Sequence, residues 1–534
     1  MKRIKCFLAA SIIALSANAQ MMDKDVYDNS TKYARLLTFI NAYYVDTTNL
    51  TQLTEKAIVT LLQNLDPHST YISAEEVKAA NEPLEGNFEG IGVEFSILND
   101  TLMIVSPISG GPSESVGIRA GDRIIAVDKE NIAGIGIKNE QVFKLLRGNK
   151  GTKVELTIVR KGTSKPMSFT VIRDKIPIHS VEAAYEIEPG VVYIRLSRFA
   201  ITSLAEMEEA MGKFTQPVTS MVLDLRTNTG GVLKTAIDLC DQFLSEGRLM
   251  VYNEGDKWPK SLEIATRQGF FEQGKLIVLI DEHSASASEI VAGAVQDWDR
   301  GIIIGRRSFG KGLVQQMLPL PDGSQIRLTV ARYHTPTGRI IQRPYDAGKV
   351  EDYYKELYQR YDKKEGEVYN SDKVNFPDSL KYITLVNERT VYGGGGIMPD
   401  IFMPQDTSWY SDYYGKINRA GLFGQFVNQY MDKERDKLKK QYKTFAAFDN
   451  NFEVSEKLFN EFIAYVEAQK IPLDEKGLAI SKENMQVQLK ALIARSIWDT
   501  SEYFETINKR IDEVFLKAMD VLKNWDEYEK EYLL

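Results

Sequence analysis

The first part of the chain has apolar residues at helical spacing. Two such rows are Tyr33, Leu36, Leu37, Ile40 and Tyr44, and then Leu53, Ala57, Leu61, Leu62 and Leu65. The pattern stops at Asp66-Pro67-His68-Ser69, because proline cannot continue a helix. We therefore expect an N-terminal helical domain over residues 20–85.

The pattern changes between residues 86 and 175. Short apolar runs of β type, at 90–95, 102–105 and 154–159, are separated by glycines. This stretch predicts a separate, small, β-rich domain.

Strands and helices alternate from residue 176 to about residue 345. Apolar runs at 221–225, 276–280 and 302–304 predict buried strands, and helical patterns follow at 233–244 and 289–298. Continuous apolar strands between helices are typical of a sheet covered on both faces. The expected α/β core spans residues 176–405, with the polar, tyrosine-rich stretch 346–390 as an insertion.

The remainder, residues 406–534, has a helical pattern to its end. One face carries Ile507, Ile511, Val514, Phe515, Ala518 and Leu522. The whole pattern predicts a multidomain α/β protein with an inserted β-rich domain and helical segments at both ends. These helical ends are candidates for contacts with a second copy or an adaptor, although a cap on the core explains them equally well.

Composition agrees with this division into domains. A chain of 534 residues is too long for one core, and 43% hydrophobic with 26% charged residues is usual for a soluble globular protein. The net charge is −8, and no dense stripe of Lys and Arg offsets it, which argues against nucleic acid as a partner.

The N-terminus predicts export. Lys2, Arg3 and Lys5 precede an apolar run at 6–15, and Ala17-Asn18-Ala19 follows. These three parts are typical of a secretory signal peptide over residues 1–19. A membrane anchor is the alternative, but a span needs about 20 apolar residues. The expected location is the periplasm or cell envelope.

Removal of the signal peptide leaves Cys240 as the last cysteine. It cannot form an intramolecular disulfide, and its place in an apolar helical row predicts a core position. No later stretch is long and apolar enough to span a membrane.

Candidate chemistry lies in the turns after the α/β strands, where ligands bind in open sheets. Ser286 is followed three residues later by Glu289, a pattern that is also an ordinary helix capping box. Gly230 and Gly231 end the preceding strand, and Lys311 stands between two glycines after the third strand. Glycine N–H groups can stabilise an oxyanion. A lysine can act as a base if burial lowers its pKa.

These motifs resemble the active-site signature of the C-terminal processing peptidases, the tail-specific proteases of serine peptidase family S41. The signature here is Ser-Ala-Ser-Ala-Ser-Glu-Ile, then Gln296-Asp297, then Ser-Phe-Gly-Lys-Gly with Val314-Gln315. The resemblance implies a crotonase-like or ClpP-like α/β protease core that acts through an acyl-enzyme without metal or organic cofactor. It further implies these roles: Ser286 as nucleophile, Lys311 as general base, Gln315 as its support, and Ala287, Gly230 and Gly231 as the oxyanion hole. Asp297 matches an acidic position near the site.

The β-rich stretch resembles a PDZ domain. Gly90-Ile91-Gly92-Val93 looks like its carboxylate-binding loop, and the turn at 117–124 is similar to that of PDZ domains in this family. A protein tail would add as an extra strand, with its apolar last residue in a pocket. Arg147 resembles a position that couples peptide binding to activation in some relatives, and a solvated surface arginine is the alternative. The expected partners are proteins with accessible, apolar C-termini.

Three other functions compete with this interpretation. His283 lies close to Ser286 in sequence, but a Ser-His-Asp triad normally joins distant segments. A catalytically inactive envelope scaffold would keep the same PDZ-like domain, and a crotonase-type acyl enzyme would keep the core. The joint presence of Ser286, Lys311 and Gln315 favours the peptidase.

Overall fold

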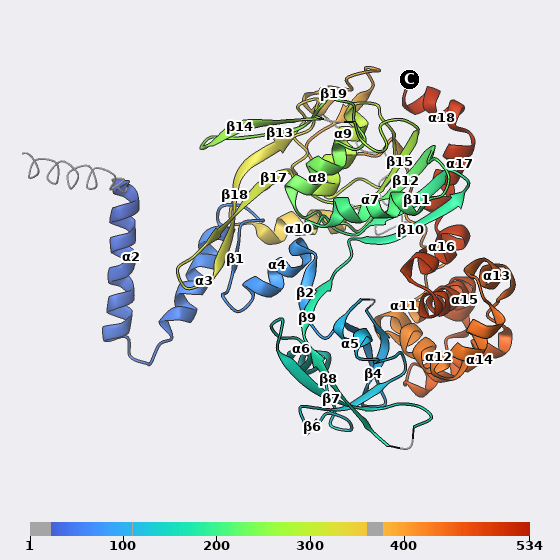
Figure 1. Cartoon of the computed structure of the whole chain (residues 1–534). Coiled ribbons are helices and arrows are strands. Elements are labelled where there is room, and N and C mark those ends of the chain that lie inside the picture. Colours follow the sequence, from blue (N-terminus) through green and yellow to red (C-terminus); the bar gives the residue numbers. More distant parts are fainter. Residues whose placement is uncertain (1–22, 109, 164, 267, 360–376) are drawn as a thin grey trace, which may run out of the picture.

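The computed structural model describes residues 23–108, 110–163, 165–266, 268–359 and 377–534. The predicted signal peptide at 1–19 lies outside the described residues, as does residue range 360–376 of the predicted insertion. Figure 1 shows the small β-rich body below the larger sheet-containing body, with the C-terminal helices along one side of both. None of the described helices has the length and apolar character that a membrane span needs.

A six-stranded sheet forms the centre of the larger body. Its order is β10-β11-β12-β15-β16-β21, and every neighbouring pair is parallel except β10 with β11. The strands are β10 (Val181–Glu188), β11 (Val191–Leu196), β12 (Ser220–Asp224), β15 (Lys275–Ile280), β16 (Ile302–Gly305) and β21 (Ile401–Phe402).

Helices cover both faces of this sheet, as predicted. On β12, Leu223 enters the core formed with α8 (Leu233–Cys240) and α9 (Ala287–Asp297), whereas Val222 packs toward α17 (Glu513–Lys523). Successive residues of a strand point to opposite faces, so a continuous apolar run serves both cores. Helix α7 (Ser203–Lys213) also lies against the first face, and Cys240 is buried there.

A second sheet lies beside the first. The loop 306–312, which contains Lys311 and is called the lysine loop below, connects the two sheets. Its order is β1-β18-β13-β14, with β17 paired to β18. The strands are β1 (Thr70–Ile72), β13 (Leu249–Gly255), β14 (Trp258–Ile264), β17 (Leu313–Pro319) and β18 (Gln325–His334). Beyond it lie α10 (Val350–Gln359), η2 (Asp378–Leu380), β19 (Lys381–Ile383) and β20 (Thr390–Tyr392).

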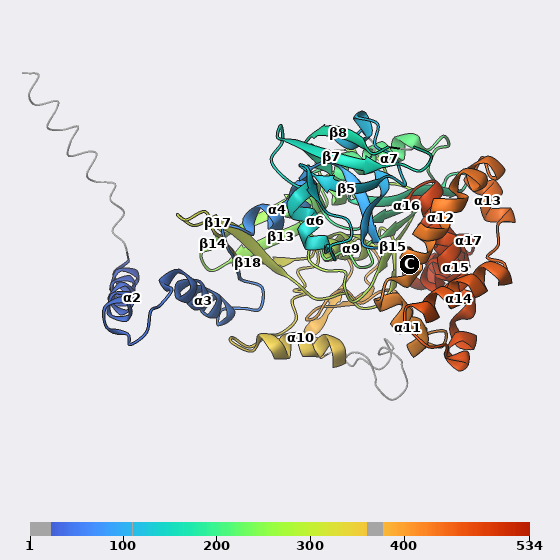
Figure 2. The ribbon, with the colours of Figure 1, turned by 90° about the horizontal axis from the view of Figure 1, so that it is seen from below.

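The N-terminal segment differs from the predicted helical domain. Helices α2 (Lys24–Tyr43), α3 (Leu50–Gln63) and α4 (Val77–Glu85) form, but α2 buries no residue and α3 buries Leu62 alone. Figures 1 and 2 both show α2 apart from the rest of the chain. The segment has no core of its own, and its strand β1 belongs to the second sheet.

The β-rich domain is attached through a two-stranded stem, in which β2 (Asn87–Gly90) pairs with β9 (Asp174–Pro177). It has a separate core that includes Leu102, Ile124 and Leu156. Its other elements are β3 (Val93–Leu98), β4 (Thr101–Pro107), α5 (Pro112–Ser115), β5 (Arg123–Val127), β6 (Glu130–Asn131), α6 (Asn139–Leu146), β7 (Lys153–Val159) and β8 (Met167–Ile172).

The C-terminal helices divide into two groups, which differs from the single helical domain expected over 406–534. The first group has its own aromatic core and contains α11 (Asp412–Arg419), α12 (Leu422–Gln441), α13 (Phe445–Asn451), α14 (Glu456–Ala468) and α15 (Glu475–Ile497). The second contains α16 (Thr500–Ile511), α17 and α18 (Trp525–Tyr532), and its apolar face covers the central sheet. A uniform helical pattern does not show which partner each face meets.

Candidate active site

Ser286 lies in a strained turn between β15 and α9. Its φ is 56° and its ψ is −111°, a region that residues with a side chain rarely adopt. Hydrogen bonds from Asp281 and Ser284 hold this turn in place. Asp281 Oδ1 accepts from the N–H groups of Thr227 (2.9 Å) and Ser284 (3.1 Å). Ser284 Oγ donates to the Leu225 carbonyl (2.8 Å). These bonds fasten the turns after β12 and β15 together, so Ser286 stands at the carboxyl edge of the central sheet.

Gly230 faces this serine turn directly. A Cβ at Gly230 would lie 2.9 Å from the Ser286 Cβ and 2.8 Å from the Ala285 carbonyl oxygen, and the φ of 99° also requires glycine. The Gly230 N–H, however, donates to Asn228 Oδ1 at 2.9 Å. This differs from the expectation that Gly230 supplies an oxyanion donor, because its N–H already has an acceptor.

Two other N–H groups stay candidates for that role. Ala287 is the first residue of α9. Its N–H therefore has no acceptor within the helix and lies at the positive end of the helix dipole. Gly231 follows Gly230 and lines the same cavity as Ser286.

The Glu289 carboxylate joins the serine turn to the lysine loop. It is fully buried, and Oε2 accepts from the N–H groups of Ser286 and Lys311, both at 2.8 Å. Oε1 accepts from Ser308 Oγ at 2.5 Å and from the Gly310 N–H at 2.6 Å. Burial raises the pKa of Glu289, while these donors act in the opposite direction. One side chain therefore fixes the Ser286 and Lys311 backbones relative to each other.

Tyr333 holds the same two residues from β18. Its hydroxyl lies 2.6 Å from the Lys311 carbonyl oxygen and 3.1 Å from the Ser286 carbonyl oxygen. Burial raises the pKa of Tyr333, which keeps the hydroxyl protonated and able to donate.

The Lys311 amine is directed toward Gln315 and is partly withdrawn from water. Nζ donates to Gln315 Oε1 at 3.0 Å. Burial lowers the pKa of Lys311 below its ordinary value, the nearby Arg327 lowers it further, and the carboxylates of Asp66 and Glu289 raise it. The surroundings thus shift the amine toward the uncharged form that a general base requires.

Ser286, Lys311 and Gln315 line one cavity of about 760 Å³. Its wall also contains apolar side chains, which include Leu84, Val232, Leu233, Ile290, Leu313 and Met317. A hydroxyl and an amine in an apolar cleft are suited to nucleophilic attack on a carbonyl group of an apolar segment.

Two other polar residues near the motifs have different surroundings. The His283 side chain is 60% exposed, and its Nε2 lies 3.9 Å from the Glu282 carboxylate, which gives no support to a Ser-His-Asp triad. Asp297 is fully buried, pairs with Arg339 at 2.6 Å and accepts from Thr337. Asp297 therefore belongs to a buried ion pair behind the site.

The candidate carboxylate-binding loop connects β2 to β3. Gly90 ends β2, and Gly92 has a φ of 72°, where a Cβ would lie 2.8 Å from the Ile176 side chain. Val93 then begins β3, which is the end strand of its sheet. The loop therefore opens onto a strand edge that can accept an added strand, with Ile91 buried beneath it.

Arg147 follows the last residue of α6, and its side chain is directed toward α4. Its Nη1 lies 2.7 Å from the Glu82 carboxylate, and its guanidinium lies 4.9 Å from the centre of the Phe88 ring. Pro83 and Leu84, which follow Glu82, line the Ser286 cavity. Arg147 thus connects the β-rich domain to the wall of the site. Its backbone lies beside the Gly90–Val93 loop, because a Cβ at Gly90 would be 3.6 Å from the Arg147 Cα.

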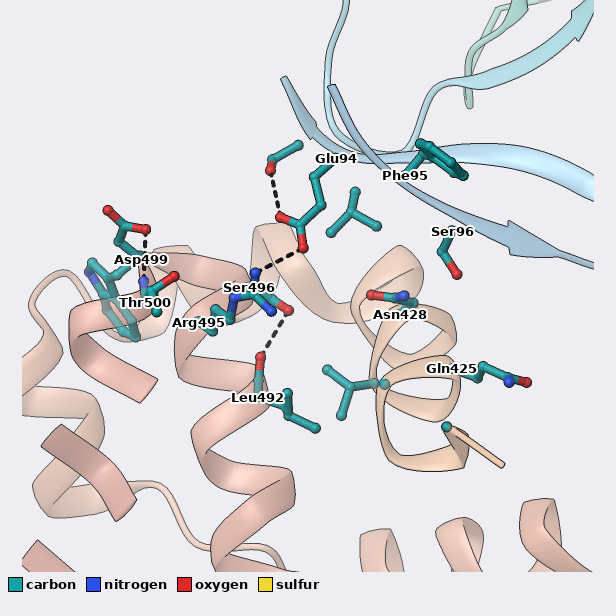
Figure 3. A pocket seen from close by; sticks show the side chains of 16 residues that line it. Glu94, Phe95, Ser96, Gln425, Asn428, Leu492, Arg495, Ser496, Asp499 and Thr500 are labelled. Carbon is teal, nitrogen blue, oxygen red and sulfur yellow. Dashed lines mark hydrogen bonds and ion pairs between the residues drawn. The ribbon is translucent and has the colours of Figure 1, made fainter. Parts of the chain in front are cut away.

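The C-terminal helices also contact β3. Figure 3 shows Glu94 paired with Arg495 of α15, at 2.9 Å, across a cavity of about 360 Å³ that Asn428 of α12 also lines. A second ion pair joins Arg123 of β5 to Asp432 of α12 at 3.0 Å. The first group of C-terminal helices is therefore joined to the β-rich domain by ion pairs at β3 and β5.

Comparisons with known proteins identify three parts of the chain. Residues 190–354 match Peptidase family S41, residues 103–160 match the PDZ domain, and residues 413–499 match a family of unknown function (DUF8443). The carboxy-terminal-processing protease of Bartonella bacilliformis is 37% identical over 63% of this chain and 78% of that protein. The carboxy-terminal processing protease CtpB of Bacillus subtilis is 33% identical over 64% of this chain and 72% of that protein. The solved structure of a photosystem II D1 C-terminal processing protease has 29% identity, covers 58% of this chain and 89% of that chain, and gives a TM-score of 0.33.

The matched families and relatives define a serine endopeptidase with an attached PDZ domain. The chain belongs to peptidase family S41, with the carboxy-terminal-processing proteases as its relatives. The family and the PDZ domain expected from the sequence are both confirmed.

Several residues that organise the site were not predicted from the sequence. The pattern indicated only a helix cap for Glu289, and it did not mark Tyr333 as a link between Ser286 and Lys311. The spacing of Glu289 from Ser286 was a signal, because a side chain that reaches back to the Ser286 N–H has a second oxygen available. The contacts of the turn at Asp66–Ser69 gave no local signal.

Proposed function

We propose that the enzyme cleaves protein substrates with Ser286 as nucleophile and Lys311 as general base. Ser286 Oγ attacks the peptide carbonyl carbon while its proton passes to Lys311 Nζ. The C–N bond then breaks, the leaving amine takes that proton, and an acyl-enzyme remains. Water, deprotonated in turn by Lys311, releases the acyl group. The observation that carries this proposal is the buried Glu289 carboxylate, which binds the backbones of both residues in one cleft.

The state of the amine supports the same roles. A free lysine is almost fully protonated at neutral pH, so it can act as a base only if its pKa falls. Burial and Arg327 both act in that direction on the pKa of Lys311. Gln315 accepts one N–H of the amine, which leaves the nitrogen lone pair to be directed elsewhere.

For the oxyanion we propose the N–H groups of Ala287 and Gly231. Developing negative charge would meet the first N–H of α9 and the positive end of its dipole. Gly230 then has a steric role, because its missing side chain allows the two turns to approach.

The PDZ domain is the proposed capture module for C-terminal tails. The terminal carboxylate would bind at Gly90-Ile91-Gly92-Val93, and the tail would pair with the free edge of β3. Phe95 and Phe143, whose rings are 5.5 Å apart, lie where an apolar last residue would pack.

Arg147 is the proposed link between capture and catalysis. It binds Glu82 of α4, and the same helix accepts hydrogen bonds from Arg327 at the Ala80 carbonyl and at Asn81 Oδ1. A shift of the PDZ domain would therefore move α4 and, with it, a guanidinium that lowers the pKa of Lys311.

Location, core type and assembly complete the proposal. The sequence of residues 1–19 supports export to the periplasm or cell envelope, and the strand–helix alternation supports a crotonase-like or ClpP-like core. Assembly through the helical ends is supported by α2, where Leu36, Phe39 and Tyr43 are all more than half exposed.

The direct test is degradation of an unfolded protein that ends in an apolar residue. We expect Ser286→Ala and Lys311→Ala to bind the tail but not to cleave it. Gly92→Trp should lose tail binding while a short internal peptide is still cleaved. Equal cleavage by wild type, Ser286→Ala and Lys311→Ala would refute the mechanism.

A further inference from the structure

The turn Asp66–Ser69, between α3 and β1, reaches the active site although it lies far away in sequence. Asp66, His68 and Ser69 are 5%, 8% and 4% exposed. His68 lines the same cavity as Ser286 and Lys311. The proposed catalytic steps use none of these side chains, so their burial at the site needs another explanation.

Asp66 ties the turn to β18. Its Oδ1 accepts from the N–H groups of His68 and Ser69, both at 2.8 Å, and from Thr329 Oγ1 at 3.1 Å. Its Oδ2 accepts from Ser69 Oγ at 2.6 Å, and the same hydroxyl oxygen accepts from the Thr329 N–H at 3.1 Å. A carboxylate with four donors defines one conformation of the turn.

The turn Asp66–Ser69 fixes the side-chain amide of Gln315. The His68 carbonyl accepts a hydrogen bond from Gln315 Nε2, across 247 sequence positions. An amide held at its nitrogen must present its oxygen on the other side, where Oε1 lies 3.0 Å from Lys311 Nζ. A side-chain amide without this anchor could turn over and direct its NH₂ group at the amine.

The His68 ring is also held in place, and it is uncharged. Its Nε2 lies 3.0 Å from the Tyr353 hydroxyl, which also accepts from Gln342 Nε2 at 3.1 Å. Burial above all, together with the positive charge of Lys311, lowers the pKa of His68 to about 3. The imidazole therefore stays neutral over the range in which Lys311 would work, and α10, which carries Tyr353, closes this side of the site.

We propose that the turn Asp66–Ser69 is a positioning element of the peptidase site, which orients Gln315 so that its oxygen holds the Lys311 amine toward Ser286. This inference rests on the proposed role of Lys311 as general base. Asp66 also has a second effect, through its charge. Three charged side chains act on the pKa of Lys311: Asp66 from the turn, Arg327 from β18 and Glu289 from α9. His68, also adjacent, is neutral.

The test measures kcat, KM and the pH profile for Asp66→Asn, Gln315→Ala and the double variant. We expect Asp66→Asn to lower kcat by about 10- to 100-fold with little change in KM, as for a misplaced catalytic group. Because Asp66 raises the pKa of Lys311, its loss should move the acid limb of kcat/KM to lower pH. In the Gln315→Ala background, the further loss of kcat should be under about threefold, because the two side chains act in one chain of contacts.

Asp322→Asn is the matched control. Asp322 also accepts from the N–H and Oγ of a serine, at 3.0 and 2.6 Å, but in the exposed turn between β17 and β18. Ser69→Ala is the milder variant if Asp66→Asn does not fold. It keeps the charge, so kcat should fall while the acid limb stays in place.

The outcomes separate the two proposals. A purely structural Asp66 would lower the melting temperature, reduce kcat equally in both backgrounds and leave the acid limb unmoved, which would overturn the positioning role. Full activity of Ser286→Ala or Lys311→Ala would overturn the proposed function itself. If those two are inactive while Asp66→Asn keeps wild-type kcat and pH profile, the inference about the turn alone is wrong.

Discussion

Replacement of Glu289 by glutamine tests the contact on which the geometry of the site depends. Glutamine keeps the size of the side chain but presents one oxygen and one NH₂ group in place of two carboxylate oxygens. Whichever way the amide is turned, two of the four donors then face another donor. Either Ser286 and Lys311 lose their acceptor, or Ser308 and Gly310 do.

The expected cost follows from these contacts. A buried donor without a partner costs about 1–3 kcal/mol, so two of them give about 2–6 kcal/mol. The Ser308 hydroxyl can rotate, and the amide should therefore keep its oxygen toward Ser286 and Lys311. We expect a loss of about 2–3 kcal/mol in the free energy of unfolding. If a similar energy is lost in holding the two loops together, kcat falls about 30- to 160-fold, at 1.36 kcal/mol for each factor of ten.

Steady-state cleavage of an apolar-tailed peptide across pH, with urea unfolding on the same samples, is the assay. Because Glu289 raises the pKa of Lys311, the acid limb of kcat/KM should also move to lower pH in Glu289→Gln. Glu282→Gln is the matched control, since Glu282 is buried in the turn that precedes α9 but pairs with Arg306 at 2.6 Å. A folded Glu289→Gln enzyme with wild-type kcat and an unmoved acid limb would refute the reasoning.

The other predictions concern Lys311, Gln315, Gly230 and the PDZ contact. The lowered pKa of Lys311 means that the unfolded chain binds more protons between the folded pKa and 10.5; stability should therefore rise with pH in that window, and Lys311→Met should reduce the slope in urea titrations. Gln315→Ala should lower kcat about tenfold or more while KM stays within about twofold; an unchanged kcat would count against its contact with the amine. Gly230→Ala should lower kcat/KM at least about 100-fold, since its Cβ would meet Ser286; near-normal activity would show that the turn can relax. Asp432→Ala removes the partner of Arg123. Because both side chains are partly exposed, the free energy of unfolding should fall by less than about 1 kcal/mol, while amide exchange in β3 becomes faster. Slower exchange would contradict the contact.

The local parts of the site could be predicted from the sequence. The strands β12, β15 and β16 are short runs of mainly apolar residues, and the turns after parallel neighbours must meet at one edge of the sheet. That rule alone brings Ser286 close to Gly230. Lys311 follows β16 in the same way, so the main chemical groups were visible as residues that follow three buried strands.

Contacts between distant segments could not be predicted in this way. The hydrogen bond from Gln315 to the His68 carbonyl joins residues 247 positions apart, and a backbone acceptor has no identity in the sequence. The acceptor of the Gly230 N–H could not be predicted either, since the Asn228 side chain could have formed several other hydrogen bonds. Pattern also gave α2 and α17 the same amphipathic character, although α17 packs on the sheet and α2 buries nothing.

These long contacts have a common consequence for how the site is built. Ser286 and Lys311 receive their positions from Glu289, within the core, whereas Gln315 receives its orientation from a turn that precedes the PDZ domain. Lys311 bonds the oxygen of the Gln315 amide, but the anchor at the amide nitrogen comes from the turn Asp66–Ser69. An arrangement of this kind lets the nucleophile turn form with the central sheet, while the alignment of the base depends on β1 being paired with β18. Conditions that loosen β1 should therefore reduce kcat before they unfold the core, and hydrogen exchange of β1 compared with β12 at increasing urea would show whether activity follows the first or the second.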